Sequence, residues 1–362
     1  MGFDFQLRAP YRVNSKSERR RFAEFCAGII LLLLISCPAS IAAQSGATPA
    51  KIPGGREVTD ELGRKLRLPR EVDRVVSLAP NLTEIVFALG DGNHLAGDTD
   101  YCDYPPEALQ KPHVGGTVNP NLEEVAALMP EVILATSINR RETVNALDRV
   151  GLPVFITDPH SVDEMIATVE HIGSALAVEK SAAALAAGLR ARLAEIDRRL
   201  AGSAPRRVLF VVWTDPLISV GRDTFIADAL RRAGGRSVVD TSAEWPHVSL
   251  EEIVRLQPEV LVFASAHAGE TQRDIEALRA RPGWKSLEAI ERGKVVVVSD
   301  AINRPAPRMV DAVEQLARAL HPDAFAAALA PSADSDSARS HSSTSDLIRF
   351  ESRTEEACAC DR

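Results

Sequence analysis

Aromatic residues, long apolar runs and positive charge are all scarce in this sequence, and each shortage excludes something. Phe, Trp and Tyr together make up 5% of the 362 residues, so an aromatic side chain in a loop is a candidate ligand contact. The most apolar run, residues 27–35, is shorter than the roughly 20 residues that a membrane-spanning helix needs. The net charge of −8 argues against a nucleic-acid partner.

Cysteine is too sparse to build a disulfide framework. Cys102 stands alone in the body of the chain, and Cys358 and Cys360 form a C-x-C pair near its end, with no second ligand cluster beside them. The sequence also lacks the nucleophile elbow, the phosphate-binding loop, the dinucleotide fingerprint and the zinc-protease helix motif. These absences predict a protein that is not an enzyme and that carries neither a metal centre nor a cofactor.

The first 43 residues are typical of an export signal. Residues 1–36 carry six basic and three acidic side chains, and this segment ends in the apolar run. The tetrapeptide Leu34-Ile35-Ser36-Cys37 resembles a bacterial lipobox, in which Cys37 becomes a lipidated N-terminus. Cleavage after a small residue at 40–43 and a retained N-terminal anchor are the alternatives. We therefore expect a periplasmic protein or a lipoprotein anchored to a membrane through Cys37.

Composition divides the rest of the chain into a lead-in, a folded body and a tail. Residues 44–71 are predicted to form a linker and a lead-in strand region, and the Ser-rich residues 326–362 a disordered tail. Between them, helical patterns alternate with short β-branched runs at 72–78, 132–135, 154–156, 208–212, 260–264 and 295–298. This alternation predicts an α/β fold with mainly parallel sheets flanked by helices. Asn81 and Glu84 have the spacing of a capping box that opens the first helix.

The folded body repeats itself. The pattern of residues 121–134 returns at residues 249–262, with a pair of glutamates at the same place in each copy. The sequence therefore predicts two similar lobes, residues 72–177 and 204–325, joined by residues 178–203. The joining segment has apolar residues at helical spacing, which predicts a single long connecting helix over residues 178–201.

The repeated glutamates fall at the start of a predicted helix in each lobe. Asn121 and Ser249 are suited to the N-cap, and Glu124 and Glu252 then fall where a carboxylate can reach back to the cap. The preceding glutamates have no such duty, so they either complement the helix dipole or form matched acidic contacts for a symmetric partner. These two candidate docking residues are Glu123 and Glu251.

Polar and aromatic side chains follow the predicted strands, at the sheet edge where open α/β sheets bind ligands. Among them, three aromatics are suited to stack on a flat ligand. The candidate ligand contacts are Tyr101, Thr117, Asn119, Trp213, Trp245, His247, Asp300 and Arg304. Histidines 160, 247 and 267 come from separate loops without metal-ligand spacing, so no metal site is predicted. Aspartates 215 and 300 with these histidines leave an acid–base pair, and hence an exported enzyme, as an alternative.

Three loops resemble motifs of a known family, the periplasmic binding proteins of cobalamin and ferric-siderophore ABC importers. Residues 101–106, Tyr-Cys-Asp-Tyr-Pro-Pro, resemble the Tyr-x-Asp-Tyr-Pro loop of its cobalamin branch. Residues 245–249, Trp-Pro-His-Val-Ser, are similar to its Trp-Pro-x-Val-Ser loop, and residues 304–308, Arg-Pro-Ala-Pro-Arg, to its Arg-x-x-Pro-Arg stretch. The resemblance extends from residue 72 to about residue 320, with the motifs in order.

The resemblance implies two lobes joined by one long helix, and binding without catalysis to deliver a corrinoid to an ABC permease and its ATPase in the inner membrane. We also expect the protein to be a monomer. It implies that Glu123 and Glu251 meet arginines of the permease. Tyr101 and Trp245 match positions that stack on the ligand. Asp300 and Arg304 match polar contacts near the corrin edge.

The sequence departs from the cobalamin branch inside these loops. Thr117, Thr136 and Ile218 stand where that branch has aromatics, and Trp213 is an aromatic where that branch has none. A haem or ferric-siderophore receptor of the same family therefore stays as the alternative to a corrinoid binder. An exported enzyme and a ligand-binding sensor on the same scaffold remain as well.

Overall fold

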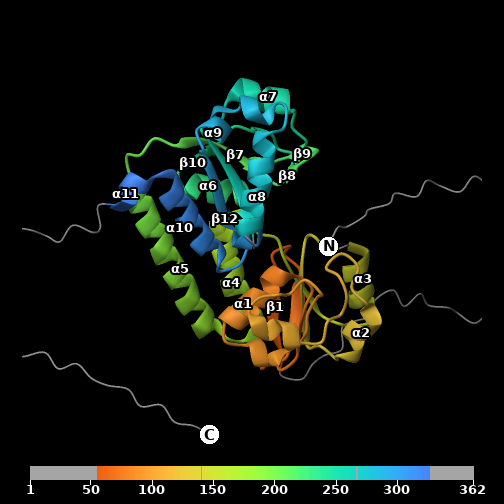
Figure 1. Cartoon of the computed structure of the whole chain (residues 1–362). Coiled ribbons are helices and arrows are strands. Elements are labelled where there is room, and N and C mark those ends of the chain that lie inside the picture. The colour runs from red at the N-terminus through yellow and green to blue at the C-terminus, as the bar shows by residue number, and fades with distance from the viewer. Residues whose placement is uncertain (1–54, 140, 266–267, 327–362) are drawn as a thin grey trace, which may run out of the picture. The chain divides into compact units, whose positions relative to one another are not determined.

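The computed structural model describes residues 55–139, 141–265 and 268–326 (Figure 1). The predicted export signal with Cys37, the first part of the linker, His267 and the tail with Cys358 and Cys360 lie outside the described residues. Within the described ranges, no helix combines the length and the apolar character needed to cross a membrane.

The first parallel sheet has the strand order β4-β3-β5-β6. Val75 lies opposite Val132, and Ile133 lies opposite Val154. Both faces are covered, which explains why the strands are unbroken apolar runs. A β1–β2 hairpin precedes the sheet. The elements are β1 (Arg56–Thr59), β2 (Lys65–Leu68), β3 (Val75–Ser77), α1 (Pro80–Ala88), η1 (Gly92–His94), β4 (Leu95–Gly97), η2 (Pro106–Gln110), α2 (Leu122–Ala127), β5 (Val132–Thr136), α3 (Arg141–Arg149), β6 (Val154–Thr157) and α4 (Val162–Leu176).

The second parallel sheet has the order β10-β7-β11-β12. A two-stranded antiparallel ribbon, β8–β9, follows β7 in the chain. The elements are β7 (Arg206–Val211), β8 (Trp213–Thr214), β9 (Leu217–Ile218), α6 (Phe225–Arg232), β10 (Gly235–Ser237), α7 (Leu250–Leu256), β11 (Val260–Ser265), α8 (Ala268–Arg279), η3 (Trp284–Ser286), α9 (Glu288–Glu291), β12 (Val295–Ser299), η4 (Asp300–Asn303), α10 (Met309–Leu320) and α11 (Pro322–Ala326). With the ribbon set aside, the two sheets share one strand order. The predicted α/β class with two similar lobes is confirmed.

Repeated residues make equivalent contacts in the two lobes. The Arg74 guanidinium donates to the carbonyl of Leu128 at the end of α2, with Nε at 2.8 Å, and Arg207 donates in the same way to the carbonyl at the end of α7. The Glu131 carboxylate accepts from the backbone N–H of Arg74, as Glu259 does from that of Arg207. Each lobe thus uses an arginine to satisfy helix-end carbonyls and a glutamate to hold the start of the first strand.

The connecting helix is α5 (Glu179–Leu200), which agrees with the predicted helix over residues 178–201. It packs against α4 of the first lobe and against α10 of the second (Figure 1). Its buried face consists of Ala182, Ala186, Leu189, Leu193 and Ile196. The largest buried apolar cluster runs through this face into both sheets, so the two lobes share one hydrophobic core.

The predicted capping box at Asn81 and Glu84 is wrong. Helix α1 begins two residues earlier than a cap at Asn81 would place it, at Pro80, with Ala79 at the N-cap and no side-chain cap. Proline suits this first position because its missing N–H would have no helical partner there. Glu84 therefore lies in the middle of α1, and it is buried, with 3% of the residue exposed.

The two predicted glutamate-bearing caps differ. The Asn121 side chain accepts from the N–H groups of Glu123 and Glu124, at 3.1 Å and 3.4 Å, as expected of an N-cap. Ser249 occupies the N-cap position of α7, but its hydroxyl donates to the Glu251 carboxylate and caps no backbone N–H. The expectation for Ser249 is therefore corrected, because its hydroxyl is oriented toward the Glu251 carboxylate and is not placed to accept from a backbone N–H of α7.

Candidate functional site

A cavity of about 410 Å³ opens between the two lobes. Most of its lining residues lie in loops or at element ends that follow the carboxyl ends of the parallel strands, as the sequence predicted. The first lobe contributes residues 79–81, Tyr101, Thr117, residues 136–138 and residues 157–160. The second lobe contributes Thr224, Phe225, Glu244, Trp245 and residues 303–305.

Buried hydrogen bonds hold the first lobe's side of this cavity. The Asn139 side chain accepts from the N–H of Thr136 at 2.7 Å and donates to the carbonyl of Thr117 at 2.6 Å, which joins two lining loops. The buried thiol of Cys102 lies 3.2 Å from the hydroxyls of Thr83 and Thr99. These contacts hold Cys102 in place directly after the lining residue Tyr101. Cys102 therefore has a packing role beside the cavity.

Backbone contacts hold the second lobe's side. The N–H of Gly221 donates to the carbonyl of Glu244 at 2.9 Å, and the N–H of Ser219 donates to that of Pro246 at 3.1 Å. Trp245 lies between these two anchored residues. A Cβ at position 221 would lie 1.9 Å from the carbonyl oxygen of Ala243, so only glycine allows this close approach.

Tyr101, Thr117, Trp245 and Arg304 are the predicted ligand contacts that line the cavity. Tyr101 belongs to the first lobe and Trp245 to the second. These two residues are 57% and 48% exposed, unusually high fractions for large rings. Their arrangement provides an aromatic surface on each side of the cavity, which suits a flat apolar ligand.

The other predicted ligand contacts do not line this cavity. Trp213 lies in the β8–β9 ribbon opposite Ile218, its indole N–H donates to the carbonyl of Asp215 at 2.8 Å, and His247 forms a bridge to the same Ile218. Asn119 is exposed at the turn beside Gly116. The structure thus separates Trp213 from the other two aromatics with which the sequence grouped it.

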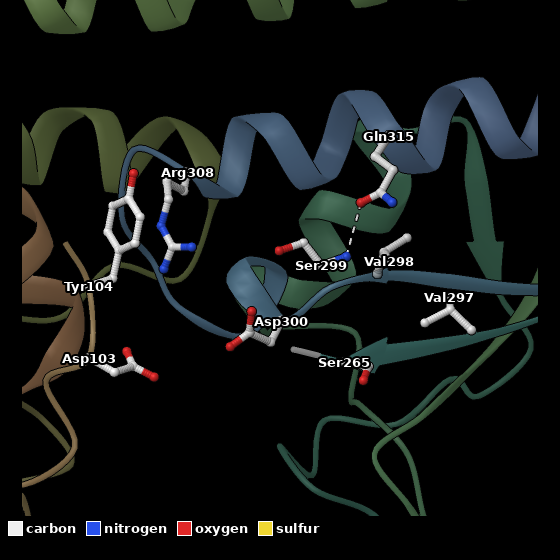
Figure 2. Close-up of a pocket in the computed structure, with 9 residues that line it drawn as sticks. All are labelled: Asp103, Tyr104, Ser265, Val297, Val298, Ser299, Asp300, Arg308 and Gln315. Atoms are coloured by element: carbon white, nitrogen blue, oxygen red, sulfur yellow. Dashed lines mark hydrogen bonds between the residues drawn. The ribbon is translucent and has the colours of Figure 1, made fainter. Parts of the chain in front are cut away.

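Asp300 lines a second cavity, of about 420 Å³ (Figure 2). The first lobe contributes Asp103 and Tyr104, and the second lobe contributes residues from β11, β12 and α10. Figure 2 shows the Arg308 guanidinium beside the Tyr104 ring, and the Arg308 Cζ atom lies 3.6 Å from the ring centroid. Figure 2 also shows the carboxylates of Asp103 and Asp300, and Arg304, which is not drawn there, contacts both of them.

An ion cluster of Glu84, Asp103, Asp300, Arg304 and Arg308 has members in the lining of both cavities: Arg304 lines the first, and Asp103, Asp300 and Arg308 line the second. The Arg304 Nη2 atom lies 3.1 Å from Asp103 Oδ2 and 3.7 Å from Asp300 Oδ2, and its Nη1 atom lies 3.4 Å from Glu84 Oε1. The Arg308 Nε–H donates to Glu84 Oε2 at 3.0 Å. Glu84 and Asp103 belong to the first lobe and the others to the second, so the cluster connects the lobes.

The charges of the cluster stabilise one another. The hydrogen bond to Asp103, with the further carboxylates Glu84 and Asp300 nearby, raises the pKa of Arg304 despite its partial burial. The same hydrogen bond lowers the pKa of Asp103. Sequence reasoning missed Glu84 because its spacing matched a capping box. The available signal was its position among Leu82, Ile85 and Val86, an apolar run that leaves α1 no exposed face there.

Asp158 and His160 also line the cavity that contains Tyr101 and Trp245, although they were not among the predicted ligand contacts. The His160 Nε2 atom lies 3.3 Å from Asp158 Oδ2. Both residues follow β6, and that position at a strand end was the signal available for them. No group of three or more potential metal ligands is assembled among the described residues.

The two candidate docking residues have equivalent positions. Glu123 and Glu251 are exposed at the second residue of α2 and of α7. Figure 1 shows these two helices well apart, one in each lobe. The hydrogen bond from Ser249 lowers the pKa of Glu251, which favours its charged form.

The family model for periplasmic binding proteins matches residues 75–301. The uncharacterized ABC transporter substrate-binding lipoprotein YvrC of Bacillus subtilis (strain 168) is 28% identical over 277 residues, which cover 74% of this chain and 86% of YvrC.

Two solved structures have the same fold. The periplasmic vitamin B12 binding protein BtuF of Vibrio cholerae is 29% identical, with a TM-score of 0.60 over 70% of this chain and 98% of BtuF. The periplasmic heme-binding protein RhuT from Roseiflexus sp. RS-1 is 26% identical, with a TM-score of 0.62 over 70% of this chain and 99% of RhuT. With its two matching sheets and a family match over more than half of its length, the chain belongs to the periplasmic binding protein family.

Proposed function

We propose that this protein is the exported substrate-binding component of an ABC importer, that it binds cobalamin or a related corrinoid, and that it acts without catalysis. The observation that carries the proposal is the pair of exposed rings, Tyr101 and Trp245, on opposite sides of one interlobe cavity. A corrin is a flat, largely apolar macrocycle, and aromatic faces are suited to hold it. The likeness to the vitamin B12 binding protein of Vibrio cholerae supports this ligand class.

Delivery to the transporter is part of the proposal. Glu123 and Glu251 are exposed at the same position of corresponding helices, which suits docking on two equivalent basic sites of a permease and its ATPase complex. We infer that the protein works as a monomer in the periplasm or as a lipoprotein anchored through Cys37.

The test is a spectroscopic titration of the exported protein with cobalamin, cobinamide, haem and a ferric siderophore. The proposal expects saturable spectral changes with at least one corrinoid and the tightest binding for that class. Tighter binding of haem or of the siderophore would show that this compound, and not a corrinoid, is the preferred ligand. Turnover of any of these compounds would contradict a purely binding function.

A haem-binding function is the second candidate. Tyr101 and His160 both line the cavity, and a tyrosine or histidine is the kind of side chain that ligates haem iron in proteins. The likeness to the heme-binding protein RhuT also favours it. The same titration decides between the two, because ligation by either side chain shifts the main absorption band of haem.

A further inference from the structure

The interlobe cavity that Tyr101 and Trp245 line, here called the main interlobe cavity, has almost no positive charge to offer a ligand. Among the described residues that line it, the charged side chains are Asp158, Glu244 and Arg304, so Arg304 is the single lysine or arginine of that lining. The availability of this one guanidinium therefore decides whether the cavity can hold an anionic group.

Arg304 is already engaged with carboxylates of the protein itself. Both terminal nitrogens of Arg304 donate to the Asp103 carboxylate. The carboxylates of Glu84 and Asp300 lie within 4 Å of these nitrogens. Glu84 is almost fully buried, so water screens its charge poorly. Arg308 does not provide a spare cation, because it pairs with Glu84 and lies over the Tyr104 ring.

The cluster as a whole is therefore not basic. It holds three carboxylates against two guanidiniums, and Asp158 and Glu244 add further negative charge to the cavity. A ligand carboxylate that leaves water needs a cation or several donors to offset its desolvation. A ligand amide, by contrast, brings N–H donors for which carboxylate oxygens are good acceptors.

We propose that Asp103 and Glu84 determine the charge specificity of the interlobe cavity, because by neutralising Arg304 they favour a ligand edge that carries amides over one that carries carboxylates. This inference rests on the proposed function and narrows its ligand class. Asp103 is the better residue for a test, because its side chain is 58% exposed and its replacement removes no buried group.

The test compares two corrinoids that share a macrocycle and differ in side-chain charge. Dicyanocobinamide carries amides where dicyanocobyrinic acid carries carboxylates. We expect the unmodified full chain to bind cobinamide more tightly. We expect Asp103→Asn to reduce that preference about tenfold by strengthening the binding of cobyrinic acid. Absorbance titration gives the dissociation constant for each ligand.

Asp240→Asn is the matched control. It removes a carboxylate 3.2 Å from an arginine, Arg222, outside both cavities, and should leave the preference unchanged. The comparison is repeated with Arg140→Gln in the background, because Arg140 lies outside the described residues but closely follows the lining segment 136–138. An unchanged preference in Asp103→Asn, or an equal change in Asp240→Asn, overturns the proposal.

A second ligand pair separates this inference from the proposed function. Haem carries two propionate carboxylates, and in its dimethyl ester both are uncharged. If neither corrinoid binds, the proposed ligand class fails, while tighter binding of the ester than of haem still supports the charge specificity. Tighter binding of haem than of its ester overturns the specificity, and failure of all four ligands to bind overturns both.

Discussion

At the scale of single residues, Asp98 is a buried carboxyl group three residues before Tyr101, which lines the site. It is fully buried, one oxygen lies 2.7 Å from His113 Nδ1, and the other has no hydrogen-bond partner among the described residues. Burial raises its pKa from 3.8 to about 6, against the opposing effect of His113. The folded state therefore holds this proton more tightly than the unfolded state does.

This raised pKa predicts a pH dependence of stability. The contribution of Asp98 is largest below pH 4 and is lost as the pH rises through about 6, because ionisation then costs more in the folded state. Asp98→Asn should flatten this part of the profile and raise the free energy of unfolding at pH 7 by about 1–2 kcal/mol. Urea unfolding between pH 4 and pH 8 measures it, and a variant that is less stable at pH 7 with an unchanged slope contradicts the prediction.

The tryptophans offer a second test at this scale. Trp245→Ala should weaken ligand binding by about 1–3 kcal/mol if its ring stacks on the ligand. Trp213→Ala is the matched control, because Trp213 is even more exposed, at 62%, yet lies outside the cavity lining. Both variants are titrated with the ligand that the unmodified protein binds most tightly, and the two losses of affinity are compared. Equal losses in the two variants would show that Trp245 has no special role.

At the scale of elements, the packing of α4 on α5 depends on one glycine. A Cβ at Gly173 would lie 2.2 Å from the Cβ of Ala182, whereas a Cβ at Gly188 would meet no atom of the described part of the chain within 4 Å. The two positions therefore separate close helix packing from helix propensity, although both are glycines in helices.

We predict opposite effects of the same substitution at these positions. Gly173→Ala should lower the free energy of unfolding by about 1–3 kcal/mol, because α4 and α5 must move apart. Gly188→Ala should raise it by about 0.5–1 kcal/mol, because alanine favours the helix and nothing obstructs it. Chemical denaturation of both variants is the measurement, and a stabilised Gly173→Ala protein would disprove the close contact.

The starts of α2 and α7 carry the proposed docking contacts. Glu123→Ala combined with Glu251→Ala should leave ligand affinity unchanged and reduce uptake through the cognate permease. Glu124→Ala combined with Glu252→Ala is the control, because these exposed glutamates are the next residues of the same helices. Uptake of labelled ligand by cells that carry each variant gives the answer. Normal uptake with the first pair would refute the docking role.

At the scale of the whole described chain, the lobes are joined by more than α5. They share the largest apolar cluster, and the buried carboxylate of Glu84 pairs across the lobes with Arg304 and Arg308. Loss of one partner from a buried ion pair leaves an uncompensated charge behind. The relative placement of the lobes therefore depends on the ion cluster as well as on the helix.

Glu84→Gln tests this connection. We expect it to lower the free energy of unfolding by about 1–3 kcal/mol, because Arg308 keeps its charge and loses its carboxylate. Glu170→Gln, which breaks the exposed pair with Arg190, should change it by less than about 1 kcal/mol. Thermal and urea unfolding of both variants are compared. Equal effects would mean that the buried cluster is no stronger than a surface ion pair.

The sequence by itself determined the α/β class, the duplication into two similar lobes, and α5 almost to the residue. These features follow from hydrophobic periodicity and local repeats, which act over a few turns or strands. It also placed Tyr101, Thr117, Trp245 and Arg304 in loops that line the cavity, since strand ends converge at one sheet edge.

Only the tertiary structure decided which distant groups meet. Arg304 and Glu84 are 220 residues apart, and their pairing depends on how the second lobe lies against the first. The same holds for Trp213, which the β8–β9 ribbon carries away from the cavity. A spacing rule cannot predict such pairs, because the free energy of burying a charge depends on every neighbour that the folded chain brings to it.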